Sequence, residues 1–246
     1  MTHPYPDYLV VGMMRAGTST IYEQITRHPR TIKAFRKELH FLTRDITPLP
    51  AEALMSMEYF EQLGYDSARP RQITGEASPS YIVVPKRILA FNPECRAIVM
   101  VRDPAERALS QYRHAVKSGS EDRSVAAAFA GLGASPYVGQ SRYAKILAEF
   151  LRHYPADQVL VMSLEAYLED TQEAMDVVYE FLGAQPVRVD PTIHGAPAPA
   201  SRDDRGDEVL SRLREVFAKQ RGAMTQVLAR AEVNTYPGSK DYFGRY

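Results

Sequence analysis

An apolar run, a glycine loop and a hydroxyl-rich helix start follow one another near the beginning of the chain. Residues 8–11 are continuously apolar, the loop after them contains Gly12 and Gly17, and residues 18–20 (Thr-Ser-Thr) open a segment with the pattern of a helix. At such a helix start, backbone N–H groups, the helix dipole and the added hydroxyl donors all favour a bound anion. The stretch therefore predicts a binding site for a phosphorylated nucleotide.

The loop departs from the pattern of ATP- and GTP-binding loops, which read G-x-x-x-x-G-K-[ST]. Gly12 and Gly17 have the required spacing and Ser19 follows, but Thr18 stands in the place of the lysine. That lysine reaches the β- and γ-phosphates of a triphosphate, and a threonine cannot do so. The nearest basic side chain is Arg15, inside the loop, where it can bind one phosphate-like group. The pattern therefore indicates a nucleotide without a β/γ-phosphate chain.

A second unit of strand, loop and helix begins near residue 96. Residues 97–101 form an apolar run typical of a strand buried on both faces of a parallel sheet. Arg102 and Asp103 end this run, and Pro104 suits the first position of a helix over residues 105–117.

The rest of the chain continues the alternation of strands and helices. We expect strands at 72–75 and 159–162, a helix at 164–182 that stops at Gly183, and a last helix at 208–231. This order predicts an α/β fold, with one domain over residues 1–246. Its central sheet would be parallel and doubly wound, flanked by helices, with a P-loop-like phosphate-binding loop and ligands at the carboxyl ends of the strands.

Composition limits the classes of function. The chain has 246 residues and a formal net charge of zero, which argues against nucleic acid or an anionic membrane as the main partner. Cys95 is the single cysteine, so no disulfide forms within the chain. The sequence shows no secretory signal pattern and no apolar stretch near the roughly 20 residues that span a bilayer. A soluble, cytoplasmic protein is therefore expected.

Four motifs occur in a fixed order along the chain. They are the glycine loop with its helix, and residues 37–41 (KELHF), 76–81 (EASPSY) and 101–112 (VRDPAERALSQY). In combination they resemble the sulfotransferases that use 3′-phosphoadenosine-5′-phosphosulfate (PAPS), in particular the heparan sulfate sulfotransferases and their bacterial relatives. A donor with one 5′-phosphosulfate and one 3′-phosphate agrees with the missing lysine of the loop.

The resemblance implies a role for each matching residue. Arg102 and Ser110 would bind the 3′-phosphate, Tyr143 is similar to an aromatic residue near the adenosine, and Arg202 lies in the region of a lid over the nucleotide. Arg15 stands where the family usually has a lysine. The loop residues that would hold the 5′-phosphosulfate are Arg15, Ala16, Gly17, Thr18 and Ser19.

The same resemblance assigns the transfer chemistry. Glu38 matches the general base of the family and His40 its companion, while Arg15 would stabilise the leaving phosphate. Side chains two positions apart do not share a face of a helix, so one of the pair is expected to take the proton and the other to orient or pack. The expected reaction is in-line transfer of a sulfuryl group to a hydroxyl or an amine. The acceptor would be a small molecule, a lipid or a glycan. This scheme needs no metal, and the sequence has no clustered His and Cys ligands.

Two other functions stay open, and the chain departs from the family in places. A P-loop kinase would need the missing lysine and a magnesium-binding carboxylate, for which Asp103 is poorly placed, and a non-catalytic nucleotide-binding module would keep the loop without a base. Ala77 stands where the heparan enzymes have a lysine, and the loop-like segment 194–207 lacks the lid motif of the family. These departures favour a small or lipid-like acceptor.

Overall fold

Six parallel strands form the central sheet, in the spatial order β2-β3-β1-β4-β5-β6. The computed structural model describes residues 6–34, 38–43, 72–133, 135–193, 204–218 and 222–244. The strands are β1 (Tyr8–Gly12), β2 (Thr31–Lys33), β3 (Ile73–Ala77), β4 (Arg96–Val101), β5 (Val159–Ser163) and β6 (Asn234–Thr235).

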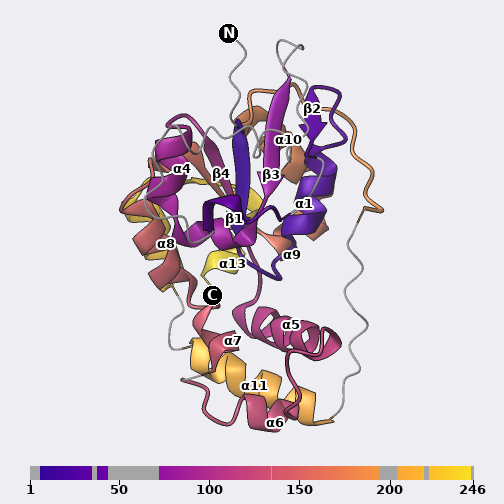
Figure 1. The fold of residues 1–246 in the computed structure, drawn as a ribbon, viewed down its shortest axis with the longest axis vertical. Helices are drawn as coiled ribbons and strands as arrows, with labels where there is room; N and C mark the ends of the chain where they lie inside the picture. The colour runs from indigo at the N-terminus through magenta and orange to yellow at the C-terminus, as the bar shows by residue number, and fades with distance from the viewer. Residues whose placement is uncertain are drawn as a thin grey trace.

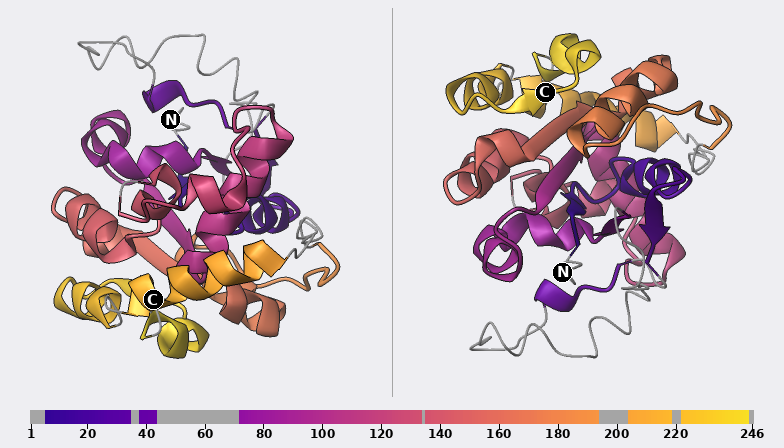
Figure 2. Two further views of the ribbon diagram at one scale, coloured as in Figure 1. Left: turned by 90° about the horizontal axis from the view of Figure 1, so that it is seen from below. Right: turned by 90° about the horizontal axis from the view of Figure 1, so that it is seen from above.

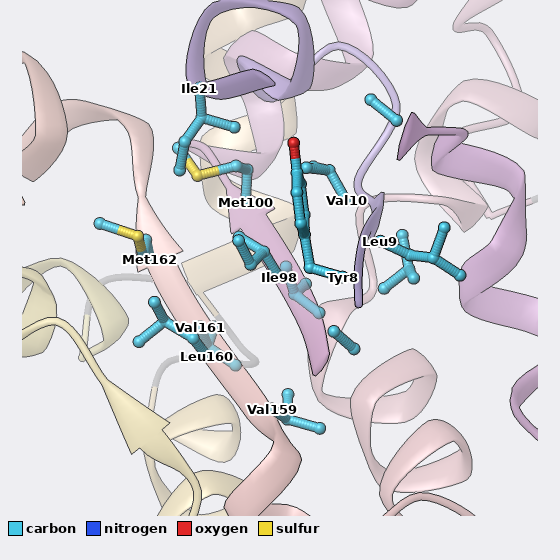
Figure 3. Close-up of a cluster of buried hydrophobic side chains, with 14 of the residues drawn as sticks. Tyr8, Leu9, Val10, Ile21, Ile98, Met100, Val159, Leu160, Val161 and Met162 are labelled. Atoms are coloured by element: carbon cyan, nitrogen blue, oxygen red, sulfur yellow. The ribbon is translucent and has the colours of Figure 1, made fainter. Parts of the chain in front are cut away.

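The middle of the sheet is apolar on both faces because helices cover both. All five residues of β1 and of β5 are buried, as are residues 97–101 of β4. Figure 3 shows side chains of these three strands packed together, with Ile21 lying over Met100. Gly75 in β3 leaves room for the ring of Tyr8, since a Cβ atom there would lie 2.2 Å from Tyr8 Cε1.

Two layers of helices enclose the sheet. Figure 1 and the view from above in Figure 2 place α4 (Pro85–Phe91) and α8 (Tyr143–Leu151) on one side. On the other side lie α1 (Thr18–Ile25), α9 (Leu164–Glu169) and α10 (Thr171–Phe181). The sheet is therefore doubly wound, as the sequence predicts. Because β1 lies between β3 and β4, the chain changes direction across the sheet at β1, where such folds bind ligands.

A second, smaller hydrophobic cluster lies beyond the carboxyl ends of the strands. It joins α5 (Pro104–Lys117), α6 (Val125–Ala128), α7 (Pro136–Gly139) and α11 (Asp204–Ala218), which Figure 1 shows together below the sheet. Its members include Leu109, Phe129, Leu213 and Phe217. The C-terminal elements are α12 (Ala223–Arg230) and α13 (Lys240–Phe243), and single turns of 3₁₀ helix form η1 (Phe41–Thr43), η2 (Pro79–Val83), η3 (Ala156–Gln158) and η4 (Pro237–Ser239).

The strands predicted from sequence are present, whereas two of the predicted helices are wrong in their extent. The helix expected at 164–182 is two helices, because the backbone of Asp170 is not helical and its carboxylate caps α10 by accepting a bond from Glu173 N at 2.9 Å. The helix expected at 208–231 is likewise two, since Gly222 has a left-handed backbone with φ 77° before α12. Within the described residues, no helix has the length and apolar character to cross a membrane.

Candidate active site

The glycine loop leads from β1 into the N-terminus of α1, which no side chain caps. Gly17 precedes the helix with φ 89°, a left-handed backbone conformation that favours glycine. The N-terminus of α5, by contrast, is capped by a side chain. The Asp103 carboxylate accepts bonds from Ala105 N and Glu106 N at 2.9 Å. An anion bound at α1 would interact favourably with its positive end, as Asp103 does with α5.

Arg15 links the glycine loop to helix α5. Its Nε donates to Ser110 Oγ at 3.4 Å. Partial burial and the nearby charge of Arg102 lower the pKa of Arg15, while Glu38 acts in the opposite direction. The structure thus brings together four residues that the sequence predicts for this site, Arg15, Glu38, Arg102 and Ser110, from three different motifs. Two cations and one carboxylate are therefore close enough for their charges to interact.

Arg102 follows β4 and is held from two sides. Its Nη2 lies 3.5 Å from Glu106 Oε2. Tyr143 is buried at the start of α8, and its hydroxyl donates to the main-chain oxygen of Arg102 at 2.9 Å. Tyr143 therefore fixes the backbone that carries Arg102. A contact between Tyr143 and the adenosine stays a prediction.

Glu38 and His40 lie on an irregular segment that is bonded to the end of β3. Glu38 N donates to Ala77 O at 3.2 Å, and His40 N donates to Ser78 Oγ at 3.3 Å. The two side chains approach one another, with His40 Nε2 3.8 Å from Glu38 Oε2, and each exposes 46% of its surface. The rule that side chains two positions apart do not share a face applies to helices, and residues 38–40 are not helical. Which of the two side chains takes the proton stays a prediction.

A buried hydrogen-bond network around Glu76 stabilises the turn that contacts His40. Glu76 is fully buried, and its carboxylate accepts bonds from Ser78 Oγ at 3.0 Å and Tyr81 Oη at 2.8 Å. The turn they stabilise carries Ser80, whose Oγ lies 2.8 Å from His40 Nδ1. The turn therefore fixes one ring nitrogen of His40 and leaves the other facing Glu38.

Backbone strain is concentrated in the same place. Four non-glycine residues of the described chain have positive φ: Arg15 at 67°, Glu38 at 56°, His40 at 51° and Glu232 at 52°. Such conformations cost free energy and persist where the surrounding structure enforces them, often at functional sites. Three of the four are the residues that the sequence assigns to the transfer chemistry.

Arg107 is a contributor to which the sequence analysis assigned no role. This arginine of α5 is completely buried, and burial lowers its pKa. Its guanidinium donates to Met14 O at 3.4 Å, Ser141 Oγ at 2.5 Å, Gln111 Oε1 at 2.7 Å and Tyr137 O. It thus ties the glycine loop to the helical cluster.

Of the remaining predicted site residues, the structure describes those of the glycine loop and α1 but not Arg202. Ala16 and Thr18 are buried in the loop and at the start of α1, and Ser19 is exposed there. Arg202 and residues 194–203 of the expected lid lie outside the described residues, whereas residues 204–207, expected in the same loop, form the first turn of α11. Among the residues that are described, no group of three or more His, Cys, Asp and Glu could hold a metal ion.

Comparison with known proteins identifies the family of the chain. Residues 5–202 match the family model described as "Sulfotransferase domain". The chain belongs to this sulfotransferase family. It is 34% identical over 200 residues to human heparan sulfate glucosamine 3-O-sulfotransferase 6, covering 76% of this chain and 54% of that protein. Mouse heparan sulfate glucosamine 3-O-sulfotransferase 5 is 25% identical over 194 residues. The chain spans about half the length of these curated relatives.

Solved structures show the same fold. A sulfotransferase from Alicyclobacillus acidocaldarius superposes with a TM-score of 0.71 at 22% identity, covering 93% of this chain and 96% of the other. The sulfotransferase domain from the curacin biosynthetic pathway gives a TM-score of 0.52 at 13% identity. At these levels of identity the solved structures show a shared fold and assign no role to a residue of this chain.

Proposed function

We propose that this protein transfers the sulfuryl group of PAPS to a hydroxyl, or an amine, of an acceptor molecule. Family membership supports PAPS as the donor. The observation that carries the proposal is the approach of Arg102, Ser110 and Glu38 to Arg15, which lies in the loop leading to the N-terminus of α1, where no side chain caps the helix. Two separate positive regions with a carboxylate beside them suit a nucleotide with phosphate groups at both ends of its ribose.

Each part of the donor has a matching region of the chain. The glycine loop and Arg15 bind the 5′-phosphosulfate, while Arg102 and Ser110 bind the 3′-phosphate. Ser110 contacts Arg15 directly, so the two anion sites share a wall. Tyr143 and Arg107 are positioning residues, since the first fixes the backbone of Arg102 and the second that of Met14.

The reaction is an in-line displacement at sulfur. The acceptor oxygen forms a bond to sulfur while the bond from sulfur to the bridging oxygen of the 5′-phosphate breaks. 3′-Phosphoadenosine-5′-phosphate leaves with the electron pair of that bond, and the acceptor proton passes to the Glu38 carboxylate. His40, bonded to Ser80, orients Glu38 from 3.8 Å away. Arg15 stabilises the charge that develops on the leaving phosphate.

The two rival functions receive less support from the same residues. A kinase would need a carboxylate for magnesium, and the candidate Asp103 already caps α5. A binding module would have no use for a strained carboxylate and imidazole beside the anion sites. Magnesium-dependent binding of ATP would favour the kinase.

The proposal is tested by incubating the protein with PAPS and a mixture of hydroxyl-bearing small molecules, lipids and glycans. Mass spectrometry should detect an acceptor that has gained one SO₃ group, with release of 3′-phosphoadenosine-5′-phosphate in equal amount. Release of that nucleotide from wild type but not from Glu38→Gln would identify the same chemistry with water as acceptor. A protein that neither binds nor consumes PAPS would contradict the proposal.

A further inference from the structure

An apolar groove lies between the start of α4 and helix α8. It has a volume of about 640 Å³, within the range of small-molecule sites. Its apolar lining comprises Ile82, Val83, Val84, Pro85, Ile146 and Phe150. Val83 exposes 71% of its surface, the most of any large apolar side chain in the part of the chain that the structure describes. Apolar surface held open in this way favours an apolar ligand.

Basic side chains surround the apolar lining. Lys86 and Arg87 lie on the α4 side, and Arg142 and Lys145 on the α8 side. The one acidic residue of the groove, Glu149, is paired with Arg152 at 2.7 Å and with His153 at 3.5 Å. The charge that remains is positive, which complements an anionic ligand.

Arg142 is the basic residue of the groove that most specifically indicates an anionic ligand. Its Nε atom is buried and has no hydrogen-bond partner among the described residues. Within the same residues, Arg142 and Lys145 form no ion pair with a carboxylate. A guanidinium that none of the described carboxylates neutralises favours an anionic ligand at this end of the groove, because a charge-assisted hydrogen bond to it is strong.

Both walls of the groove are joined to the candidate active site. On one wall, Ile82 packs against the end of β1, where a Cβ atom on Gly12 would lie 3.3 Å from Ile82 Cβ. Ser80, two residues earlier, contacts His40. On the other wall, Arg142 precedes Tyr143, which bonds to Arg102 O. The end of the groove that carries Ile82 and Arg142 therefore lies beside the glycine loop.

We propose that the groove binds the acceptor, and that the acceptor is a single-chain anionic lipid with a hydroxyl in its head group. The head group lies at Arg142 with its hydroxyl toward Glu38, and the hydrocarbon chain extends along α8 toward Phe150. This inference rests on the proposed sulfuryl transfer for the identity of its ligand as an acceptor. Binding in the groove itself is measured without the donor.

The binding test uses three probes that separate chain from charge. Calorimetry below the critical micelle concentration compares 1-lauroylglycerol 3-phosphate, uncharged 1-lauroylglycerol and chainless glycerol 3-phosphate. Each buried methylene contributes roughly fourfold in affinity, so the first probe should bind at least tenfold more tightly than either of the others. Equal binding of the charged and uncharged lipids, or no binding of any probe, would overturn the proposal.

Substitutions in the groove test whether the lipid binds there. Val83→Asp and Arg142→Ala should each weaken binding of 1-lauroylglycerol 3-phosphate at least tenfold. Val116→Asp, which alters an exposed apolar residue of α5, and Arg212→Ala, which removes an exposed arginine of α11, should leave it within twofold. Thermal unfolding checks that each variant is folded. Equal losses in the groove variants and their controls would contradict the assignment.

Parallel titrations with 3′-phosphoadenosine-5′-phosphate separate this inference from the proposed function. If the nucleotide binds and the lipid does not, the groove assignment is wrong and the proposed function stands. If the lipid binds in the groove and neither the nucleotide nor PAPS binds, sulfuryl transfer is wrong and the lipid is no acceptor. Support requires both ligands, a sulfated lipid product by mass spectrometry, and a KM for the lipid that rises at least tenfold in Val83→Asp while nucleotide affinity stays unchanged.

Discussion

The donor side of the candidate site is buried in the fold, whereas the side that carries Glu38 and His40 is half open to solvent. On the donor side, Arg107 is completely buried and bonds both to the glycine loop and to the helical cluster. On the acceptor side, Glu38 and His40 each expose 46% of their surface. Under the proposed function, this contrast predicts that changes on the donor side affect stability as well as binding, while changes at Glu38 and His40 affect turnover alone.

The largest effect is expected on the open side. Glu38→Gln should lower kcat by roughly 10²–10⁴-fold, the usual contribution of a positioned general base, because the change keeps the shape and removes the charge. Affinity for 3′-phosphoadenosine-5′-phosphate should stay within about twofold. Steady-state kinetics measures the change in kcat, and calorimetry measures the affinity for the nucleotide.

Two further variants sharpen this result. His40→Ala should reduce kcat less than Glu38→Gln, and the reverse order would make His40 the base. Glu232→Gln is a matched control, since Glu232 is an exposed glutamate with the same left-handed backbone. Near-normal turnover in both Glu38→Gln and His40→Ala would show that the transfer groups lie elsewhere.

On the buried side, loss of Arg107 should act on folding as well as on binding. Arg107→Ala leaves Met14 O, Tyr137 O and Ser141 Oγ without their donor. An unsatisfied buried group costs about 1–3 kcal/mol, so the free energy of unfolding should fall by roughly 3 kcal/mol or more. Urea denaturation measures this fall, and Arg113→Ala on the same helix should change stability by less than about 0.5 kcal/mol. Equal stability of the two variants would contradict the comparison.

The smallest effect is expected from removing the Tyr143 hydroxyl. A matched variant distinguishes loss of its contact with Arg102 O from a general loss of stability. Tyr143→Phe removes the hydroxyl that donates to Arg102 O, and Tyr154→Phe removes one that donates to Cys95 O at 2.7 Å. Each change should lower the free energy of unfolding by about 1 kcal/mol. Only Tyr143→Phe should also weaken nucleotide binding, by roughly fivefold. The same nucleotide affinity in both variants would remove Tyr143 from the donor site.

The parts of the fold that follow from local chemistry could be predicted from the sequence. Buried parallel strands give continuous apolar runs, and the glycine loop and Pro104 mark the ends of elements. The edge strands β2 and β6, of three and two residues, are too short to leave a pattern. The breaks at Asp170 and Gly222 depend on one capping carboxylate and one left-handed residue inside otherwise helical sequence.

Within the site, sequence could predict residues but not their approach to one another. Glu38 and His40 converge because an irregular backbone is held by Ala77, Ser78 and Ser80, residues about forty positions away. Arg107 was missed as a positioning residue since its acceptors are mostly main-chain oxygens and a serine, which carry no charge pattern. Such contacts depend on how distant segments pack.

The central claim is that two anion sites hold the two ends of one nucleotide, and calorimetry tests it most directly. We expect 3′-phosphoadenosine-5′-phosphate to bind at least thirtyfold more tightly than adenosine 5′-phosphate. The reason is that leaving a desolvated charge without its partner costs roughly 2–5 kcal/mol. Arg102→Ala should abolish most of this preference without unfolding the protein. Equal affinity of wild type for the two nucleotides would contradict the account.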